Sequence, residues 1–234
     1  MIPDSKIDLW IKNNLNVLLV GTHGIGKTSI IESAFTRHNV KWRYFSAATM
    51  DPWVDFIGVP KEQTTDDGVS YLGLIRPLEF QNDDIEFLMF DELNRAPAKV
   101  RNAVMELIQF KSINGKKFHN LRAVWAAINP YDEEETYDVD ELDPAQQDRF
   151  HVIYTLPTTP SKQYFTDKYG NDMAQRAIEW WSTLTDTVRP LVSPRRLDYA
   201  LEMYCKGGDL SDILDKTVPR IDIDTGIFVA DLTH

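Results

Sequence analysis

The segment VLLVGTHGIGKTS, residues 17–29, constrains the fold of this chain more than any other segment. Four aliphatic residues, enough for a short buried strand, run directly into a loop that holds three glycines. A helical pattern follows at residues 28–35. A strand that turns through a glycine-rich loop into a helix is typical of an α/β domain, in which helices cover the faces of a mostly parallel sheet.

The rest of the chain continues this alternation of strands and helices. Residues 99–110 place Val100, Val104, Leu107 and Ile108 on one helical face, which predicts a helix packed along a sheet. Apolar runs of strand length, with helical patterns between the first four, occur at residues 16–20, 42–47, 85–90, 121–128 and 152–156. We therefore predict a three-layer αβα core with a parallel five-stranded sheet.

Two hairpins and a helical region complete the predicted organisation. Asn114-Gly115 suits a type I′ turn between residues 110–113 and 116–118, and residues 58–78 form a longer hairpin with a polar tip. Helical patterns follow at residues 162–168, 173–185 and 194–204, with Ser193 as the cap of the last. The predicted domains are a core at residues 1–159, a small helical lid at 160–218 and a tail at 219–234.

Composition limits the classes of protein to which the chain can belong. With 43% hydrophobic residues among 234, it can bury a sizeable core, and no window reaches the roughly 18 apolar residues of a membrane span. We expect a soluble cytoplasmic protein. Cys205 is the only cysteine, which excludes an internal disulfide and a cysteine-rich zinc site. A net charge of -11 is unfavourable for binding nucleic acid, although a local basic spot is compatible with it.

The glycine-rich loop matches the spacing of a phosphate-binding loop, G-x-x-x-x-G-K followed by Ser or Thr. In such a loop the backbone N–H groups point at phosphate oxygens, at the positive end of the following helix. Lys27 would reach the terminal phosphates and Thr28 the Mg²⁺. A plain glycine-rich turn is the alternative. The candidate nucleotide-binding residues are Gly21, Thr22, His23, Gly24, Ile25, Gly26, Lys27, Thr28 and Ser29.

Hydrolysis of a nucleotide needs further polar groups, and three segments offer them. In IEFLMFDELNRAP, Asp91 would hold the Mg²⁺ and Glu92 would activate the attacking water; the alternative is a solvated acidic pair that caps the next helix. Asn129 ends the strand in AVWAAINP, where a turn-forming role is the alternative. Cations for the γ-phosphate are offered by arginines that could equally be surface salt-bridge partners: Arg149, Arg195 and Arg196.

The order of these segments resembles the MoxR branch of the AAA+ ATPases, within the helix-2-insert group of P-loop NTPases. The resemblance runs from the phosphate loop through the insert at residues 58–78, FDELNRAPAKVRNAVMELIQF at 90–110 and the Asn114-Gly115 hairpin. It continues through AAINP at 126–130, ELDPAQQDRF at 141–150 and SPR at 193–195. It implies that Asn129 is sensor 1, that Arg195 is sensor 2 on the lid and that Arg149 is the arginine finger.

The same resemblance implies a function and partners. It predicts an Mg²⁺-dependent ATP hydrolase that forms a ring, commonly of six subunits, in which Arg149 completes the neighbour's site. The ring would remodel a separate protein, for which a von Willebrand factor A domain is a plausible component, and the two hairpins would contact it. The alternative is a nucleic-acid motor or nuclease-associated NTPase, suggested by three lysines near the second hairpin: Lys111, Lys116 and Lys117. A small-molecule kinase fits less well, because the consecutive Asp91-Glu92 and Asn129 suit attack by water.

Overall fold

The structure is a computed structural model that describes residues 2–80, 84–130, 140–208 and 211–214. The chain divides into two compact units. One unit, the core, comprises Ile2–Gly21 and Lys27–Leu156, and the other comprises Thr22–Gly26 and Pro157–His234. The predicted tail, residues 219–234, lies outside the described residues.

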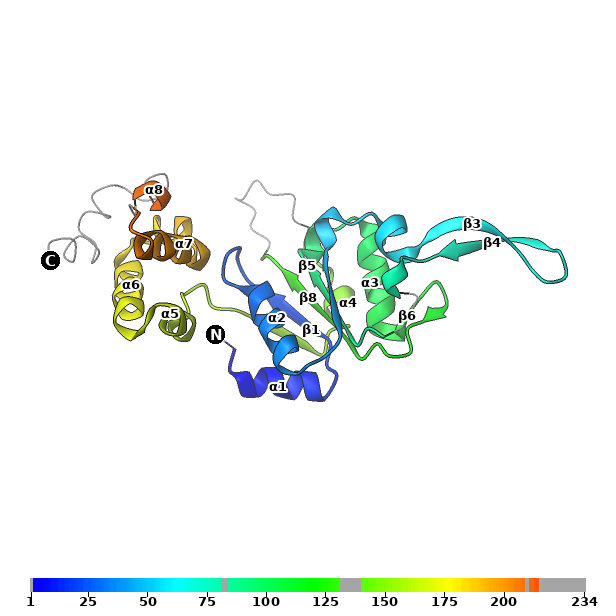
Figure 1. Cartoon of the computed structure of the whole chain (residues 1–234), viewed down its shortest axis with the longest axis horizontal. Coiled ribbons are helices and arrows are strands. Elements are labelled where there is room, and N and C mark those ends of the chain that lie inside the picture. The colour runs from blue at the N-terminus through cyan, green and yellow to red at the C-terminus, as the bar shows by residue number, and fades with distance from the viewer. Residues whose placement is uncertain (1, 81–83, 131–139, 209–210, 215–234) are drawn as a thin grey trace. The chain divides into compact units, whose positions relative to one another are not determined.

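A five-stranded parallel sheet forms the centre of the core (Figure 1). Its strands are β1 (Val17–Val20), β2 (Trp42–Ser46), β5 (Phe87–Asp91), β8 (Ala123–Ile128) and β9 (Val152–Thr155). They lie in the order β2-β5-β8-β1-β9, and every neighbouring pair is parallel. The predicted strands are thus all present, with ends that differ from the prediction by up to two residues.

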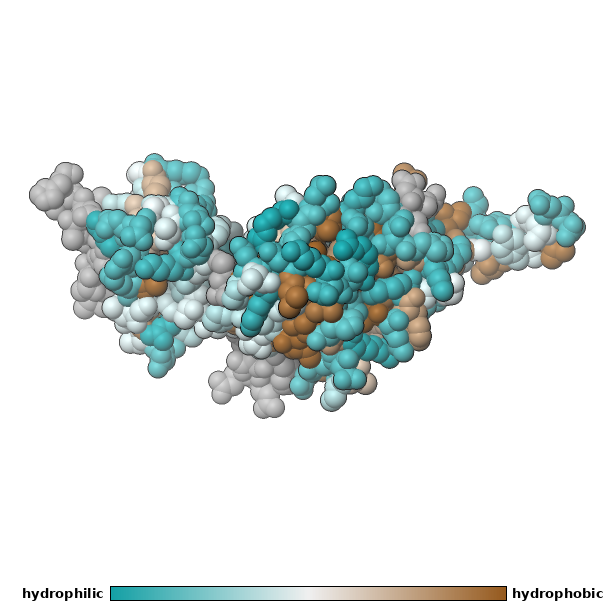
Figure 2. Space-filling view, turned by 90° about the horizontal axis from the view of Figure 1, so that it is seen from below, coloured by the Kyte–Doolittle hydropathy of each residue, from teal (hydrophilic) through white to brown (hydrophobic). Residues whose placement is uncertain are grey.

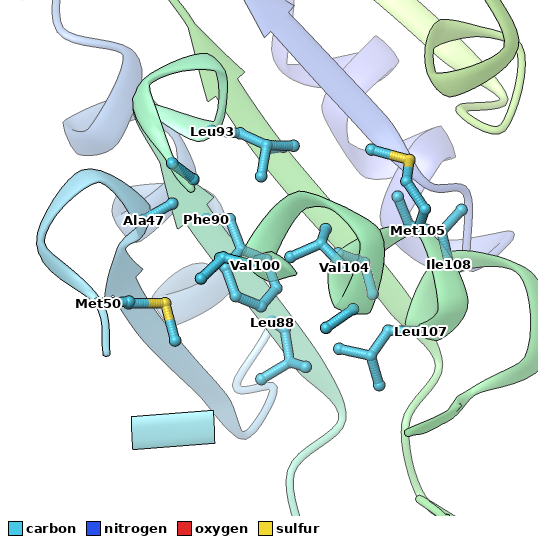
Figure 3. Packing of buried hydrophobic residues seen from close by; sticks show 14 of the residues in the cluster. Ala47, Met50, Leu88, Phe90, Leu93, Val100, Val104, Met105, Leu107 and Ile108 are labelled. Atoms are coloured by element: carbon cyan, nitrogen blue, oxygen red, sulfur yellow. The ribbon is translucent and has the colours of Figure 1, made fainter. Parts of the chain in front are cut away.

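Helices cover both faces of this sheet, which confirms the three-layer fold. On one face, Phe35 of α2 (Lys27–Arg37) contacts the rings of Phe87 and Trp125, and Trp10 of α1 (Asp4–Lys12) also contacts Trp125. On the other face, α3 (Ala98–Phe110) packs against alternate residues of β5. Figure 3 shows the side chains of Val100 and Val104 directed toward Leu88 and Phe90. Because successive strand residues point to opposite faces and both faces are covered, β8 is apolar throughout and β5 is apolar up to Asp91.

Parallel strands bring the candidate site residues to one edge of the sheet. Val20 lies beside Ile128, and Phe90 lies beside Ala126, so β1, β5 and β8 end close together. Gly21, Asp91 and Asn129 are at or just beyond these three ends. Loops at the carboxyl ends of parallel strands are where open α/β sheets bind their ligands.

Two hairpins extend from the core. The longer one, β3 (Val59–Thr64) with β4 (Ser70–Ile75), projects away from the sheet in Figure 1, and Figure 2 shows apolar residues on it. Its Leu72 is 75% exposed. The shorter one, β6 (Ser112–Ile113) with β7 (Lys116–Lys117), turns at Asn114 and Gly115, whose φ angles of 49° and 75° are those of the predicted type I′ turn.

Arg76 joins these two hairpins, together with a hydrogen bond from the Lys116 ammonium to the Leu74 carbonyl oxygen (3.4 Å). Arg76 follows β4, and its Nη2 donates hydrogen bonds to the carbonyl oxygens of Ile113 (3.1 Å) and Lys116 (3.0 Å). Its guanidinium also lies over the ring of Phe118, 4.6 Å from the centroid. The two carbonyl groups flank the turn of the shorter hairpin, so Arg76 fastens the base of one hairpin to the other.

In the second unit, the described residues between 162 and 214 are largely helical. Its helices are α5 (Lys162–Tyr169), α6 (Asn171–Thr183), α7 (Pro194–Cys205) and α8 (Ser211–Leu214), packed around a cluster that includes Phe165 and Trp180. The Ser193 side chain accepts a hydrogen bond from the Arg196 backbone N–H, which is the predicted cap of α7. Asp198 joins α5 to α7 by accepting hydrogen bonds from Lys168 and Tyr169.

Short elements complete the description. They are α4 (Pro144–Gln147), a π-helical turn at Pro52–Ile57, and 3-10 turns at Ala47–Thr49, Leu78–Phe80, Leu93–Arg95 and Arg189–Leu191. Over the described residues, no helix has the length and apolar character that crossing a membrane requires.

Candidate active site

Lys27 is the centre of the candidate site. It is the first residue of α2 and is only 8% exposed. Its ammonium donates hydrogen bonds to the Gly21 carbonyl oxygen (2.6 Å) and to Asn129 Oδ1 (2.9 Å). The structure therefore brings the phosphate-loop lysine and the predicted sensor, 102 residues apart in the chain, into direct contact.

Thr28 and Asp91 meet beside it. The Thr28 hydroxyl donates to Asp91 Oδ2 over 2.5 Å. A hydroxyl and a carboxylate are hard oxygen ligands, and Mg²⁺ at phosphate-transfer sites takes one or two such protein groups together with water and phosphate oxygens. Within the described ranges, no group of three or more His, Cys, Asp and Glu residues could hold a metal by itself. The pair thus fits a Mg²⁺ that is shared with a nucleotide.

Glu92 occupies a left-handed backbone conformation. Its φ of 55° and ψ of 39° place it in the αL region, which is uncommon for residues other than glycine. Its carboxylate forms an ion pair with Arg95, with Nη1 at 3.1 Å from Oε1. The expected alternative, an acidic pair that caps a helix, does not describe Glu92, whose side chain makes no cap hydrogen bond to the turn Leu93–Arg95. The helix α3 begins only at Ala98.

The middle of the phosphate loop, Thr22–Gly26, groups with the helical unit. There the Arg195 backbone N–H donates to the Gly24 carbonyl oxygen over 2.9 Å. Gly24 has a φ of +74°, and a Cβ at this position would lie 2.7 Å from Ser193 Oγ, so close approach and backbone conformation both require glycine. Thr22 and Ile25 are partly buried, whereas His23 and Ser29 are exposed.

The candidate arginines differ in their surroundings. Arg149 is exposed and, among the described residues, has no hydrogen-bond or ion-pair partner. In particular, it forms no ion pair with the adjacent Asp148. It precedes β9 and so lies toward the edge where the strands begin, whereas Lys27 lies where they end. Arg195 is exposed, and the partly buried Arg196 has an Nε atom without a hydrogen-bond partner in the described part of the chain.

Three further residues at the site were given no individual role by the sequence analysis. Tyr44, on β2, lies close enough to the acidic pair to be affected by it: burial raises the pKa of its phenol, and the negative charges of Asp91 and Glu92 raise it further. Arg95 pairs with Glu92, and Asn94 Nδ2 donates to the Asn129 carbonyl oxygen over 2.9 Å. Only the position of Asn94 and Arg95, two and three residues after Glu92, could have indicated them.

Lys111 does not lie at the hairpin tip, where the nucleic-acid hypothesis placed it. Its ammonium donates to Asn16 Oδ1 (3.1 Å), just before β1, and to the Ile108 carbonyl oxygen (3.4 Å). Burial lowers the pKa of Lys111 from 10.5 to about 8. Lys111 directly follows α3 with a φ of 52°, and this conformation carries the side chain back toward the core. Of the three lysines, only the exposed Lys116 and Lys117 lie on the hairpin.

Comparison with known proteins places this chain in a family. The sequence model of the ATPase family associated with various cellular activities (AAA) matches residues 16–152, more than half of the chain. The chain belongs to this family. It is a family of ATPases.

A curated relative agrees with this assignment and adds the MoxR type. Chaperone MoxR1 of Mycobacterium tuberculosis is 35% identical over 168 residues, which cover 62% of this chain and 41% of that protein. The chain thus spans about two fifths of the length of its curated relative. It is a MoxR-like AAA+ ATPase, as the sequence resemblance predicted.

Solved structures share the fold. The Holliday junction branch migration motor RuvB of Thermotoga maritima matches with a TM-score of 0.50 and 14% identity, over 91% of this chain and 66% of that one. A point mutant of the same RuvB matches with a TM-score of 0.51 and 14% identity, over 93% and 69%. At this identity the likeness concerns the fold alone.

Proposed function

We propose that this chain is the Mg²⁺-dependent ATPase subunit of an oligomeric ring that remodels a partner protein. The observation that carries the catalytic part is the presence of two hydrogen-bonded pairs, Lys27 with Asn129 and Thr28 with Asp91, at one edge of the sheet. Lys27 would bind the terminal phosphates, and Thr28 and Asp91 would hold the Mg²⁺, which neutralises charge on the β- and γ-phosphates when bound.

The remaining site residues would act on water and on developing charge. In this proposal Glu92 leaves its ion pair with Arg95 and accepts a proton from the attacking water. The water oxygen bonds to the γ-phosphorus as the bond from that phosphorus to the bridging oxygen breaks, and ADP leaves. Asn129 orients the water, and Arg195 stabilises the charge that develops on the transferred phosphoryl group.

The catalytic part is tested by two substitutions at the same site. Glu92→Gln is expected to retain ATP binding and to lose steady-state turnover, whereas Lys27→Ala is expected to weaken binding itself. Fluorescent-nucleotide titration and phosphate release measure the two effects separately. Turnover by Glu92→Gln at the parental rate would remove Glu92 from its proposed role.

The surroundings of Arg149 support the proposal of a ring. Arg149 is exposed, has no partner among the described residues and lies away from Lys27. In a ring with head-to-tail interfaces it would complete the neighbouring subunit's site. Mixing inactive Glu92→Gln with inactive Arg149→Ala should then restore activity. In a random equal mixture, about a quarter of the sites combine an intact Glu92 with a neighbouring Arg149. No restored activity in an assembled mixture would argue against an arginine finger supplied by the neighbour.

Contact with a partner protein is assigned to the two hairpins, β3–β4 and β6–β7. The exposed apolar side chains of the longer hairpin, Tyr71 and Leu72 among them, suit such a contact. A protein with a von Willebrand factor A domain is the partner we would look for first. Tagged Glu92→Gln, held with ATP and Mg²⁺, should capture it from the source cells, and Leu72→Ser should reduce the capture. Retention of DNA or RNA instead would favour a nucleic-acid motor.

A further inference from the structure

The turn after β5 contains a buried polar side chain to which the proposed function gives no role. Asn94 is 2% exposed. Its Nδ2 donates to the Asn129 carbonyl oxygen at 2.9 Å, whereas its Oδ1 has no hydrogen-bond partner in the described part of the chain. A buried amide with one unsatisfied atom is costly to fold, so its presence in a catalytic segment needs an explanation.

Asn94 joins this turn to the segments that follow β8. Besides the side-chain bond to Asn129, its own carbonyl oxygen accepts from the Asp140 backbone N–H (3.1 Å) and from Arg101 Nη1 (3.5 Å). Arg101 and Asp140 are themselves paired over 2.5 Å. Asn94 therefore restrains the turn through both its side chain and its backbone carbonyl group.

The residue that needs such restraint is Glu92. A residue other than glycine remains in the αL region only when the surrounding structure holds it there. Glu92 is two positions before Asn94 in the same tight turn, whose Arg95 backbone N–H donates to the Glu92 carbonyl oxygen over 2.9 Å. Releasing Asn94 from Asn129 would allow this turn to relax and would move the Glu92 carboxylate.

The acceptor of the Asn94 side-chain hydrogen bond is Asn129, the predicted sensor. Asn129 accepts from Asn94 through its backbone carbonyl and from Lys27 through its side chain. Thus one hydrogen bond connects the turn that carries the base to the residue that contacts the phosphate-loop lysine. Placement of a catalytic group to within a fraction of an ångström is worth large factors in rate, so this connection can control turnover without touching the nucleotide.

We propose that Asn94 is a positioning residue for ATP hydrolysis, which holds the Glu92 turn and Asn129 in one fixed arrangement through its bond to the Asn129 carbonyl group. This inference rests on the proposed roles of Glu92 and Asn129. A residue that only stabilises the fold would change the midpoint of unfolding and leave the kcat of the folded protein unchanged. A positioning residue changes kcat.

The test uses two substitutions that keep the number and the branching of the side-chain heavy atoms. Asn94→Leu removes the donor and the unsatisfied acceptor together, and Asn94→Asp keeps the shape but replaces the donor by an oxygen that faces the Asn129 carbonyl group. For both, kcat is expected to fall by a factor of about ten or more, with KM and ATP affinity changed by less than about threefold. If one of the two variants does not fold, kcat can still be measured on the other.

Asn16 supplies a matched control. It is also 2% exposed, and it contacts the other end of β8 by accepting from the Val124 backbone N–H at 2.9 Å. Asn16→Ala is expected to lower the thermal midpoint while the kcat of the folded fraction stays within about twofold of the parent. A loss of kcat in Asn16→Ala equal to that in Asn94→Leu would show that kcat follows stability in general and would overturn the inference.

A double substitution with Glu92→Gln separates this inference from the proposed function. If Glu92→Gln alone keeps parental turnover, the proposed base is wrong. If it loses turnover while both Asn94 variants keep the parental kcat, the inference about Asn94 is wrong and the proposed function stands. If Asn94 acts through Glu92, then Asn94→Leu with Glu92→Gln should turn over no more than about threefold slower than Glu92→Gln alone. A multiplied loss, or an equal weakening of ATP binding, would contradict a positioning role.

Discussion

Replacing Lys111 by methionine should remove a pH dependence of stability that the structure predicts above neutral pH. The Lys111 ammonium has Asn16 Oδ1 and the Ile108 carbonyl oxygen as acceptors, and burial lowers its pKa from 10.5 to about 8. Methionine has a similar length and no charge, so the Lys111→Met protein keeps most of the packing.

The direction of the effect follows from the protons bound in each state. Between pH 8 and pH 10.5 the unfolded chain holds the Lys111 proton and the folded protein has released it, so the free energy of unfolding rises with pH. The full lowering corresponds to about 3 kcal/mol. Because Lys111 is only partly buried, screening by solvent reduces this to about 1–2 kcal/mol, of which about 1 kcal/mol develops between pH 7 and pH 9.5.

Urea unfolding followed by tryptophan fluorescence measures this change at pH 7, 8, 9 and 9.5. Tyrosines and other lysines that titrate in this range are common to both proteins, so the difference between parent and Lys111→Met isolates Lys111. That difference should change by about 1 kcal/mol in favour of the parent as the pH rises. Lys117→Met, at an exposed position on β7, is the control and should follow the parent. A constant difference between parent and Lys111→Met would refute the assignment of a depressed pKa.

Three further predictions concern the loop, the metal ligands and the hairpins. Gly24→Ala should weaken ATP binding and destabilise the protein by more than Gly68→Ala, because both have a positive φ but only Gly24 would bring a Cβ to 2.7 Å from Ser193 Oγ; equal losses in thermal unfolding would contradict this. Thr28→Val should abolish Mg²⁺-stimulated phosphate release while lowering the free energy of unfolding by only about 1–2 kcal/mol, the value of one hydrogen bond to a carboxylate. Unchanged Mg²⁺ stimulation would exclude Thr28 as a ligand. Arg76→Met should release the β6–β7 hairpin and speed amide hydrogen exchange at residues 112–117, and Arg76→Lys should do so too, because one ammonium cannot replace the guanidinium contacts with two carbonyl groups and the Phe118 ring. Unaltered exchange in both would show that the hairpins are not joined through Arg76.

Local patterns in the sequence predicted the parts of the fold that depend on neighbouring residues. The phosphate loop, the Asn114-Gly115 turn and the Ser193 cap each follow from a few consecutive side chains. The strands were predictable because β5 and β8 are apolar on both faces, as a covered parallel sheet requires. The helix α1 was missed; it is short, and no side chain caps its first turn.

Contacts between distant segments could not be predicted in this way. The sequence predicted that Lys27, Asp91 and Asn129 would serve one site, partly through a family resemblance, but not that Asn94 would reach Asn129 or that Tyr44 would lie near Asp91. Lys111 was assigned to a basic hairpin tip, and the structure directs it to Asn16, 95 residues away.

The sequence by itself determined the class of fold and the residue types available for ATP hydrolysis, because hydrophobic periodicity and turn chemistry act over a few residues. Only the tertiary structure decided which of those residues meet, because the strand order β2-β5-β8-β1-β9 places side by side strands that are far apart in the chain. A polar side chain at a strand end then takes its partner from whichever strand lies next to it, as Asn94 does with Asn129.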